Sequence, residues 1–213
     1  MIATDELIKK VRLLLNEPDE DVTLAVLGED TRRLGDTIRV LLRDAVLFVQ
    51  HNKTYGVLNP VSSTPDSLEL TDNGNGTGSV LLPDDFVTLI EFKVKGWERP
   101  CTTMYKSNSP IALAQSNQNT RGGCCKPVCI ESVNNEGKPV LVYYSLPEEV
   151  SPVISSFVYE ALFDEGTGLN TVASNPLVMA VAYQCAGLVY GVFEKHDTAN
   201  AFMTLALSWC KKE

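Results

Sequence analysis

Apolar residues near the N-terminus recur at three- and four-residue spacing, which is the spacing of one face of an α-helix. A first helix is predicted over about 4–16, with Thr4 as its N-cap and an apolar face made of Leu7, Ile8, Val11, Leu14 and Leu15. A second is predicted over about 30–51, with an apolar face made of Leu34, Ile38, Leu41, Leu42, Ala45, Phe48 and Val49. The arginines of this second helix lie on its other faces, where they either meet solvent or contact an acidic neighbour.

The pattern changes to short alternating runs after residue 58, which is typical of strands. The stretches SLELT and SVLLP flank the turn-rich DNGNGTG and predict a hairpin. In TLIEFKVKG, side chains alternate between two faces, with Ile90, Phe92 and Val94 on one of them. Two more strands are predicted around 126–132 and 138–145, joined by NNEGK.

Helical signals return in the last third of the chain. SPVISSFVYEALF (151–163) opens with Ser151 as N-cap and Pro152 at the first helical position. A second helix is predicted over 176–193 after Asn175-Pro176, and a third over about 197–211 with Asp197 as N-cap.

This order of elements predicts an α+β protein. We expect a helical bundle built from the N- and C-terminal helices, with an antiparallel β insert and a long polar arm. The expected single domain covers 1–213, and its segments are 1–57, 58–146 and 147–213.

The apolar run at 176–193 has no charged residue and is near the lower length limit for a membrane span. It nevertheless contains Gln184, two tyrosines and two glycines. We therefore expect a buried core or subunit-interface helix and no membrane partner.

Residues 106–123 form the expected arm. They are polar, nearly uncharged and without a clear period. Loops of this length within a domain are often functional or contact a partner.

The formal net charge is −9, and the sequence pI is about 4.8. A protein whose main task is to grip nucleic acid is usually basic, because affinity comes from neutralising phosphates. The N-terminus also lacks the order of basic, apolar and small residues of a signal peptide. We therefore expect a reducing compartment and free thiols for the six cysteines.

The strongest chemical candidate is the cluster Cys124, Cys125 and Cys129, with Cys101 as a conceivable fourth ligand. Its spacing does not match the paired CxxC pattern of common zinc sites. With only two histidines in the chain, a cysteine–histidine catalytic pair is poorly supported. Small apolar side chains at a loop-to-strand junction remain the simpler interpretation, and no cofactor is expected.

Asp84 and Asp85, in LPDDF, could form an acid pair or a tight corner. Neighbouring strand residues project to opposite faces, so two adjacent carboxylates do not readily share a metal or a proton. Pro83 and the aspartates favour a turn. We expect a corner, with Asp84 capping it.

The stretches LPDDFVTLIEFKVKGWERP and PVLVYYSLPEEVSP, with a polar arm between them and helices on either side, resemble head-to-tail connector proteins of tailed phages. These are the adaptor or tail-tubular ring proteins beneath the portal. The segment YKSNSP…AQSNQNTRGGCCKPVC is similar to collar ring proteins of crAss-like phages that infect gut Bacteroidetes. The cysteine-rich strand has no evident role in such a ring.

The resemblance implies a structural virion protein and not an enzyme. Such proteins assemble in the host cytoplasm into homo-oligomeric rings, often dodecamers. The portal lies above the ring, the next tail or ring protein lies below, and double-stranded DNA passes through without sequence-specific binding. The candidate contact residues are Asn108, Gln115, Asn117, Gln118, Arg121, Trp97, Arg32 and Arg33.

Two alternatives stay open. One is a cysteine-dependent enzyme or metal-binding protein that uses Cys124, Cys125 and Cys129. The other is a soluble binding module of unknown ligand.

Overall fold

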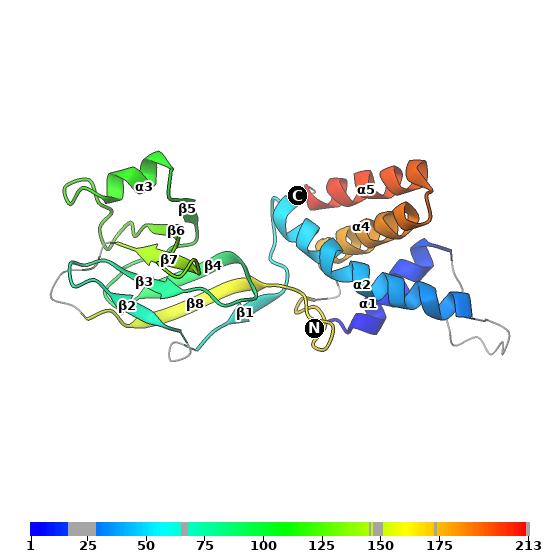
Figure 1. The fold of residues 1–213 in the computed structure, drawn as a ribbon, viewed down its shortest axis with the longest axis horizontal. Helices are drawn as coiled ribbons and strands as arrows, with labels where there is room; N and C mark the ends of the chain where they lie inside the picture. The colour runs from blue at the N-terminus through cyan, green and yellow to red at the C-terminus, as the bar shows by residue number, and fades with distance from the viewer. Residues whose placement is uncertain (17–28, 65–67, 145, 147–150, 173, 212–213) are drawn as a thin grey trace. The chain divides into compact units, whose positions relative to one another are not determined.

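Helices from both ends of the chain pack around a shared apolar core in the computed structural model (Figure 1). The structure describes residues 1–16, 29–64, 68–144, 146, 151–172 and 174–211, with the backbone alone for 29–33. Contacts within the chain define two compact units. The first comprises Met1–Asn59 and Leu162–Glu213, and the second comprises Pro60–Ala161. Together the described residues form five helices and two sheets, a mixed α+β fold.

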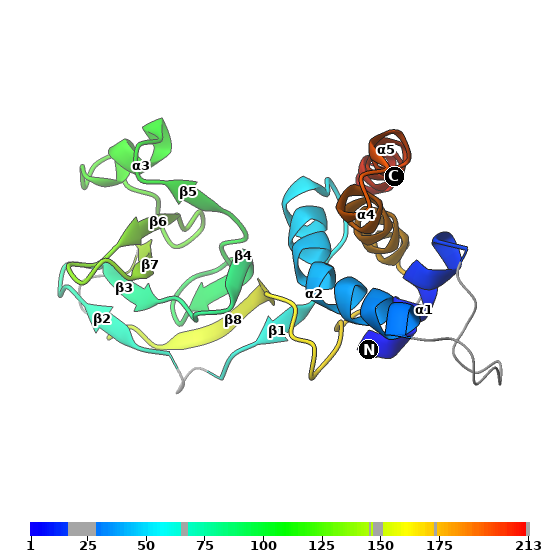
Figure 2. The ribbon, with the colours of Figure 1, turned by 45° about the vertical axis from the view of Figure 1, so that its right-hand side comes forward.

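The first unit contains α1 (Thr4–Leu14), α2 (Glu29–Asn52), α4 (Pro176–Val192) and α5 (His196–Cys210). Figures 1 and 2 both show α4 and α5 lying side by side. Their bounds agree with the predicted helices to within a few residues. The predicted apolar face of α2 is confirmed, since Ile38, Leu42 and Val49 are fully buried.

The helix starts agree less well with the sequence. Asn175 caps α4 as expected, accepting a hydrogen bond of 3.0 Å from the backbone N–H of Leu177. Thr4 is not a cap, because α1 begins at Thr4 itself and its hydroxyl donates to the carbonyl of Glu165 at 2.8 Å. Asp197 lies in the first turn of α5 and not at its N-cap, where it still complements the helix dipole.

The apolar run of α4 belongs to the core of the first unit, with Leu177, Val181 and Ala186 fully buried. Among the parts of the chain that the structure describes, no helix has both the length and the apolar character needed to cross a membrane.

The second unit consists of two facing sheets (Figure 2). The three-stranded sheet has the order β1 (Pro60–Ser62), β8 (Ile154–Ala161), β4 (Phe86–Val94). The five-stranded sheet has the order β2 (Leu70–Asp72), β3 (Gly78–Leu81), β7 (Pro139–Tyr143), β6 (Cys129–Val133), β5 (Met104–Lys106). The core between them includes Val80, Phe92, Leu141, Tyr143 and Phe157.

The predicted hairpin is confirmed: β2 and β3 are antiparallel, with Leu70 opposite Val80. The β6–β7 hairpin is also confirmed, and in its turn the Asn134 side chain accepts hydrogen bonds from the N–H groups of Glu136 and Lys138, both at 2.9 Å. The expectation of purely antiparallel pairing is wrong at one edge, where β5 runs parallel to β6. Simple alternation also fails along β4, because register shifts interrupt its pairing with β8.

The helix predicted over 151–163 is wrong. Residues Ile154–Ala161 form β8, which pairs with β1 on one side and β4 on the other. Ile154, Phe157 and Tyr159 are buried, and β-branched and aromatic residues of this kind fit a pleated surface. The β region therefore extends to Ala161 and not only to residue 146.

Candidate interaction surface

The polar arm contains a short helix, α3 (Pro110–Gln115), where the sequence showed no period. Ser109 caps it, since its Oγ accepts a hydrogen bond of 3.2 Å from the N–H of Ala112. Pro110 occupies the first helical position, where its missing N–H costs nothing. Figures 1 and 2 both show α3 beyond β5 and β6, on the side away from β8.

Gln115 closes the arm back on itself. Its side-chain Nε2 donates to the carbonyl of Ile111 at 3.1 Å, and its Oε1 accepts from the N–H of Gly122 at 2.9 Å. The residue is only 3% exposed. Gln115 was expected to contact a partner, but its burial gives it a structural role within the arm.

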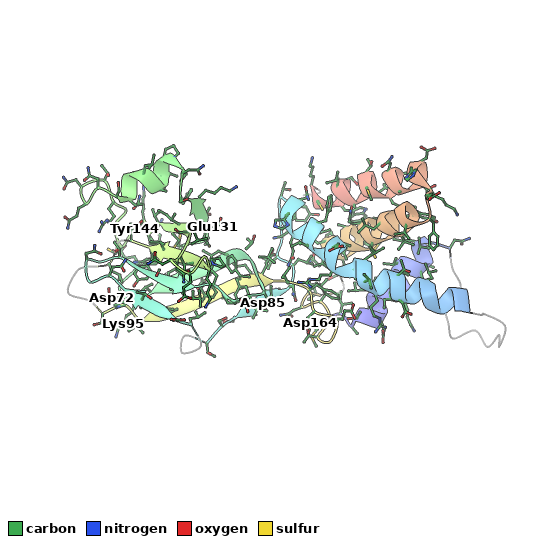
Figure 3. All side chains as sticks on the ribbon, viewed as in Figure 1. Asp72, Asp85, Lys95, Glu131, Tyr144 and Asp164 are labelled. Atoms are coloured by element: carbon green, nitrogen blue, oxygen red, sulfur yellow. The ribbon has the colours of Figure 1, made fainter. Side chains whose placement is uncertain are left out.

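Arg121 fastens the arm to the strands below it. Its Nε donates to the carbonyl of Gln115 at 3.1 Å, and its Nη1 donates to the carbonyl of Asn75 in the β2–β3 turn at 3.2 Å. The guanidinium carbon also lies 5.5 Å from the ring centroid of Tyr144, which Figure 3 labels. Arg121 therefore holds the arm in place from a half-buried position.

The outer surface of the arm mixes amide and apolar side chains. Asn108, Asn117 and Gln118 are exposed, as expected of contact residues. Ile111 and Leu113 on α3 are 40% and 66% exposed. We call these five residues the arm surface. Apolar side chains displayed on a hydrogen-bonded projection are suited to contact with another protein.

Trp97 is a core residue and not a surface contact. It is 4% exposed, and its ring packs edge-on against Phe92 at a centroid distance of 5.5 Å and against Tyr143 at 6.3 Å. Arg32 and Arg33 lie in the first turns of α2, and their side chains are outside the described residues.

The LPDDF stretch is a corner, as predicted, but the expected Asp84 cap is not found, because the Asp84 side chain makes no hydrogen bond to the described residues. The N–H of Phe86 donates to the carbonyl of Pro83 at 3.0 Å, which closes a four-residue turn. Asp84 is exposed, whereas Asp85 accepts a hydrogen bond of 2.9 Å from the hydroxyl of Tyr159. Burial, together with the neighbouring Asp85, raises the pKa of Tyr159 to about 12. The two carboxylates therefore have separate surroundings.

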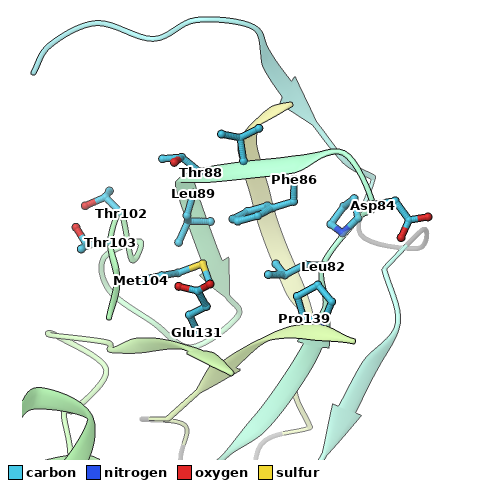
Figure 4. A pocket seen from close by; sticks show the side chains of 12 residues that line it. Leu82, Asp84, Phe86, Thr88, Leu89, Thr102, Thr103, Met104, Glu131 and Pro139 are labelled. Atoms are coloured by element: carbon cyan, nitrogen blue, oxygen red, sulfur yellow. The ribbon is translucent and has the colours of Figure 1, made fainter. Parts of the chain in front are cut away.

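A groove of about 620 Å³ lies beside this corner, between β4 and the segment leading into β5 (Figure 4). Its walls include Phe86, Leu89 and Met104, and its acidic groups are Asp84 and Glu131. Both β4 and β5 are edge strands. The groove combines apolar walls with negative charge. It is therefore suited to a cationic or extended peptide segment and not to nucleic acid.

The cysteines of the second unit form two pairs. Cys101 and Cys129 lie together in the core, where their mutual hydrogen bond lowers the pKa of Cys101 to about 7. Burial, and then Cys101, raises the pKa of Cys129 well above its usual value. Cys124 and Cys125 lie in the loop before β6, with their sulfur atoms 3.9 Å apart.

The candidate cluster of three cysteines is thus divided. The donor atoms of Cys124, Cys125 and Glu98 lie within 4.8 Å of one another, a group that does not include Cys129 among the described residues. Hydrogen bonds with Glu98 and Cys124 raise the pKa of Cys125 to about 11. Sequence reasoning missed Glu98, because only the fold brings the end of β4 beside this loop.

Both histidines belong to the first unit. His51 lies in the last turn of α2, and its Nδ1 is 3.0 Å from the carbonyl oxygen of Leu47. His196 is the first residue of α5. Residues 60–161 contain no histidine, so neither cysteine pair has an imidazole within its own unit.

The sequence matches no known family model, and no curated protein is significantly similar to it.

Proposed function

We propose that the protein is a structural subunit of the ring that joins the capsid to the tail in a tailed phage. In this role it extends the DNA channel beneath the portal and presents its lower surface to the next tail or ring protein. The ring is homo-oligomeric, and the subunit performs no catalysis. In this ring, the helices from both chain ends form the ring body. The β insert with its arm links neighbouring subunits.

The arm surface is the observation that carries this proposal. Ile111 and Leu113 are exposed to solvent although their side chains are apolar. Here the side chains of Gln115 and Arg121 fix the loop with four hydrogen bonds, so its exposed apolar side chains are held in position to contact a neighbour. A fixed contact surface loses less conformational entropy on association than a flexible one.

The charge of the chain supports the proposal as well. A net charge of −9 repels the phosphate backbone, so DNA can pass a ring of such subunits without being bound. This agrees with a conduit and argues against a nucleic-acid-binding module.

Electron microscopy of the purified chain, alone and with the portal protein of the same phage, tests the proposal. We expect closed rings, or rings stacked on the portal, and recovery of the chain in the virion fraction. A chain that stays monomeric with the portal present and is missing from virions would refute it.

A further inference from the structure

Cys124 and Cys125 occupy the two central positions of a turn. The N–H of Lys126 donates to the carbonyl of Gly123 at 2.9 Å, which closes the turn around them. In a strand, adjacent side chains would project to opposite faces. In this turn their sulfur atoms are 3.9 Å apart and point to the same side of the loop.

A backbone hydrogen bond brings a carboxylate to the same place. The N–H of Glu98 donates to the carbonyl of Cys124 at 3.0 Å, so the segment after β4 is tied to the turn. The Glu98 oxygen and the two sulfurs then lie within 4.8 Å of one another. Trp97, buried in the core beside Glu98, anchors this segment.

We propose that Glu98, Cys124 and Cys125 bind one Zn²⁺ ion. This site goes beyond the structural role in a phage ring and does not depend on it. It also differs from the ligand set that the sequence left open as an alternative, because Glu98 takes the place of Cys129.

The sulfur separation fits the metal. Two thiolates bound to one tetrahedral zinc at about 2.3 Å each are about 3.8 Å apart. The observed separation of 3.9 Å needs almost no adjustment. A carboxylate oxygen on the same ion lies about 3.6 Å from each sulfur, which the exposed Glu98 side chain reaches by a small rotation.

The donor types select the class of metal. Thiolates favour zinc and other soft cations, and they disfavour Mg²⁺ and Ca²⁺, which prefer oxygen ligands. Three protein ligands leave the fourth position of the tetrahedron to water. Binding converts both thiols to thiolates and releases two protons, so affinity falls as the pH is lowered.

Titration of the full reduced chain with Zn²⁺ against a chromophoric chelator tests the site. We expect one equivalent bound, with proton release in unbuffered solution. Co²⁺ provides a second readout, because thiolate ligation gives an intense near-ultraviolet charge-transfer band. Cys124→Ser and Cys125→Ser should each weaken this band, the double substitution should remove it, and Glu98→Gln should weaken Zn²⁺ binding roughly 10-fold or more.

Two control variants separate this site from general metal affinity. Glu136→Gln removes an exposed carboxylate in another turn, and Cys185→Ala removes a buried thiol in α4; both should bind Zn²⁺ as the unchanged chain does. Circular dichroism checks that each variant is folded. Absence of stoichiometric binding, or binding that survives the Cys124→Ser/Cys125→Ser double substitution, would overturn the proposal.

Discussion

The hydroxyl of Tyr159 on β8 donates a hydrogen bond of 2.9 Å to the Oδ1 atom of Asp85, at the corner that leads into β4. Phe86 stacks beside this bond, with its ring centroid 5.6 Å from that of Tyr159. Of the two neighbouring aspartates, one therefore joins adjacent strands of the same sheet, while Asp84 faces solvent. The LPDDF stretch acts as a structural corner with a built-in link to β8.

Asp85→Ala should destabilise the protein by about 1–2 kcal/mol, because it leaves the hydroxyl of the buried Tyr159 without its acceptor. Chemical denaturation measures the change. Asp84→Ala is the matched control, and its free energy of unfolding should stay within about 0.5 kcal/mol of the unchanged chain, since its side chain is exposed. Equal losses for the two variants would contradict the assignment.

Alkaline pH should lower the free energy of unfolding of the second unit. Burial is the main cause that raises the pKa of Tyr159 and of Tyr143 to about 12, with Asp85 and Asp72 as smaller causes. Both tyrosines therefore ionise more readily in the unfolded chain, where the pKa is about 10. The stability that they contribute is complete below pH 10 and is lost as the pH rises from about 10 to 12.

Unfolding free energies measured across this pH range check the expectation. Tyr159→Phe and Tyr143→Phe should each make the alkaline loss less steep. The tyrosinate absorbance of the native chain should also rise at higher pH than that of the denatured chain. Coincident titration curves for the two states would contradict the predicted shifts.

The sequence was sufficient to predict those elements that have strong local signals. The apolar face of α2, the Asn175 cap of α4 and the Asn134 turn all depend on residues within a few positions of one another. Local propensities can predict such features. The corner at LPDDF belongs to the same group.

Prediction from the sequence failed where contacts with residues distant in the chain determine the structure. Ser151-Pro152 is a helix-start signal, but Ile154–Ala161 is flanked by β1 and β4 and gains more from pairing with both than from forming a helix. The enrichment of this segment in Ile, Val, Phe and Tyr was the available signal. Glu98 meets Cys124 and Cys125 only through tertiary structure, so no spacing rule could have found it.

Gln115→Ala should loosen the arm without unfolding the second unit. The substitution removes the acceptor for the N–H of Gly122 and the donor to the carbonyl of Ile111, a local cost of about 1–3 kcal/mol. Amide hydrogen exchange should show faster exchange at Gly122. Exchange in β7 should be unchanged.

Asn119→Ala supplies the comparison for this experiment. It removes an exposed amide side chain four residues further along the arm. Exchange at Gly122 should stay as it is in the unchanged chain. If both variants accelerate it equally, Gln115 does not fasten the arm.

Leu113→Glu should prevent assembly while leaving the fold intact, if the arm links neighbouring ring subunits. Glutamate keeps the helix propensity of leucine and replaces an exposed apolar contact by a charge. Val133→Glu is the matched control, because Val133 is 67% exposed and lies outside the arm surface. Electron microscopy and sedimentation with the portal compare the two.

If Leu113→Glu forms normal rings, the arm does not link neighbouring subunits, but ring formation itself is not contradicted. Loss of assembly in both variants would indicate a general effect of added negative charge. Only a selective defect in Leu113→Glu supports the arm surface.

Pro60 and Glu160 lie opposite each other in the β1–β8 pair, so the second unit begins and ends at the same point. Just outside it, the Asn59 side chain donates to the carbonyl of Leu162 at 3.1 Å and holds the two connecting strands of chain together. A segment whose ends meet can be exchanged by recombination without stretching the chain on either side. Residues 60–161 thus have the form of a cassette, which can be replaced as a whole while the chain on either side keeps its place.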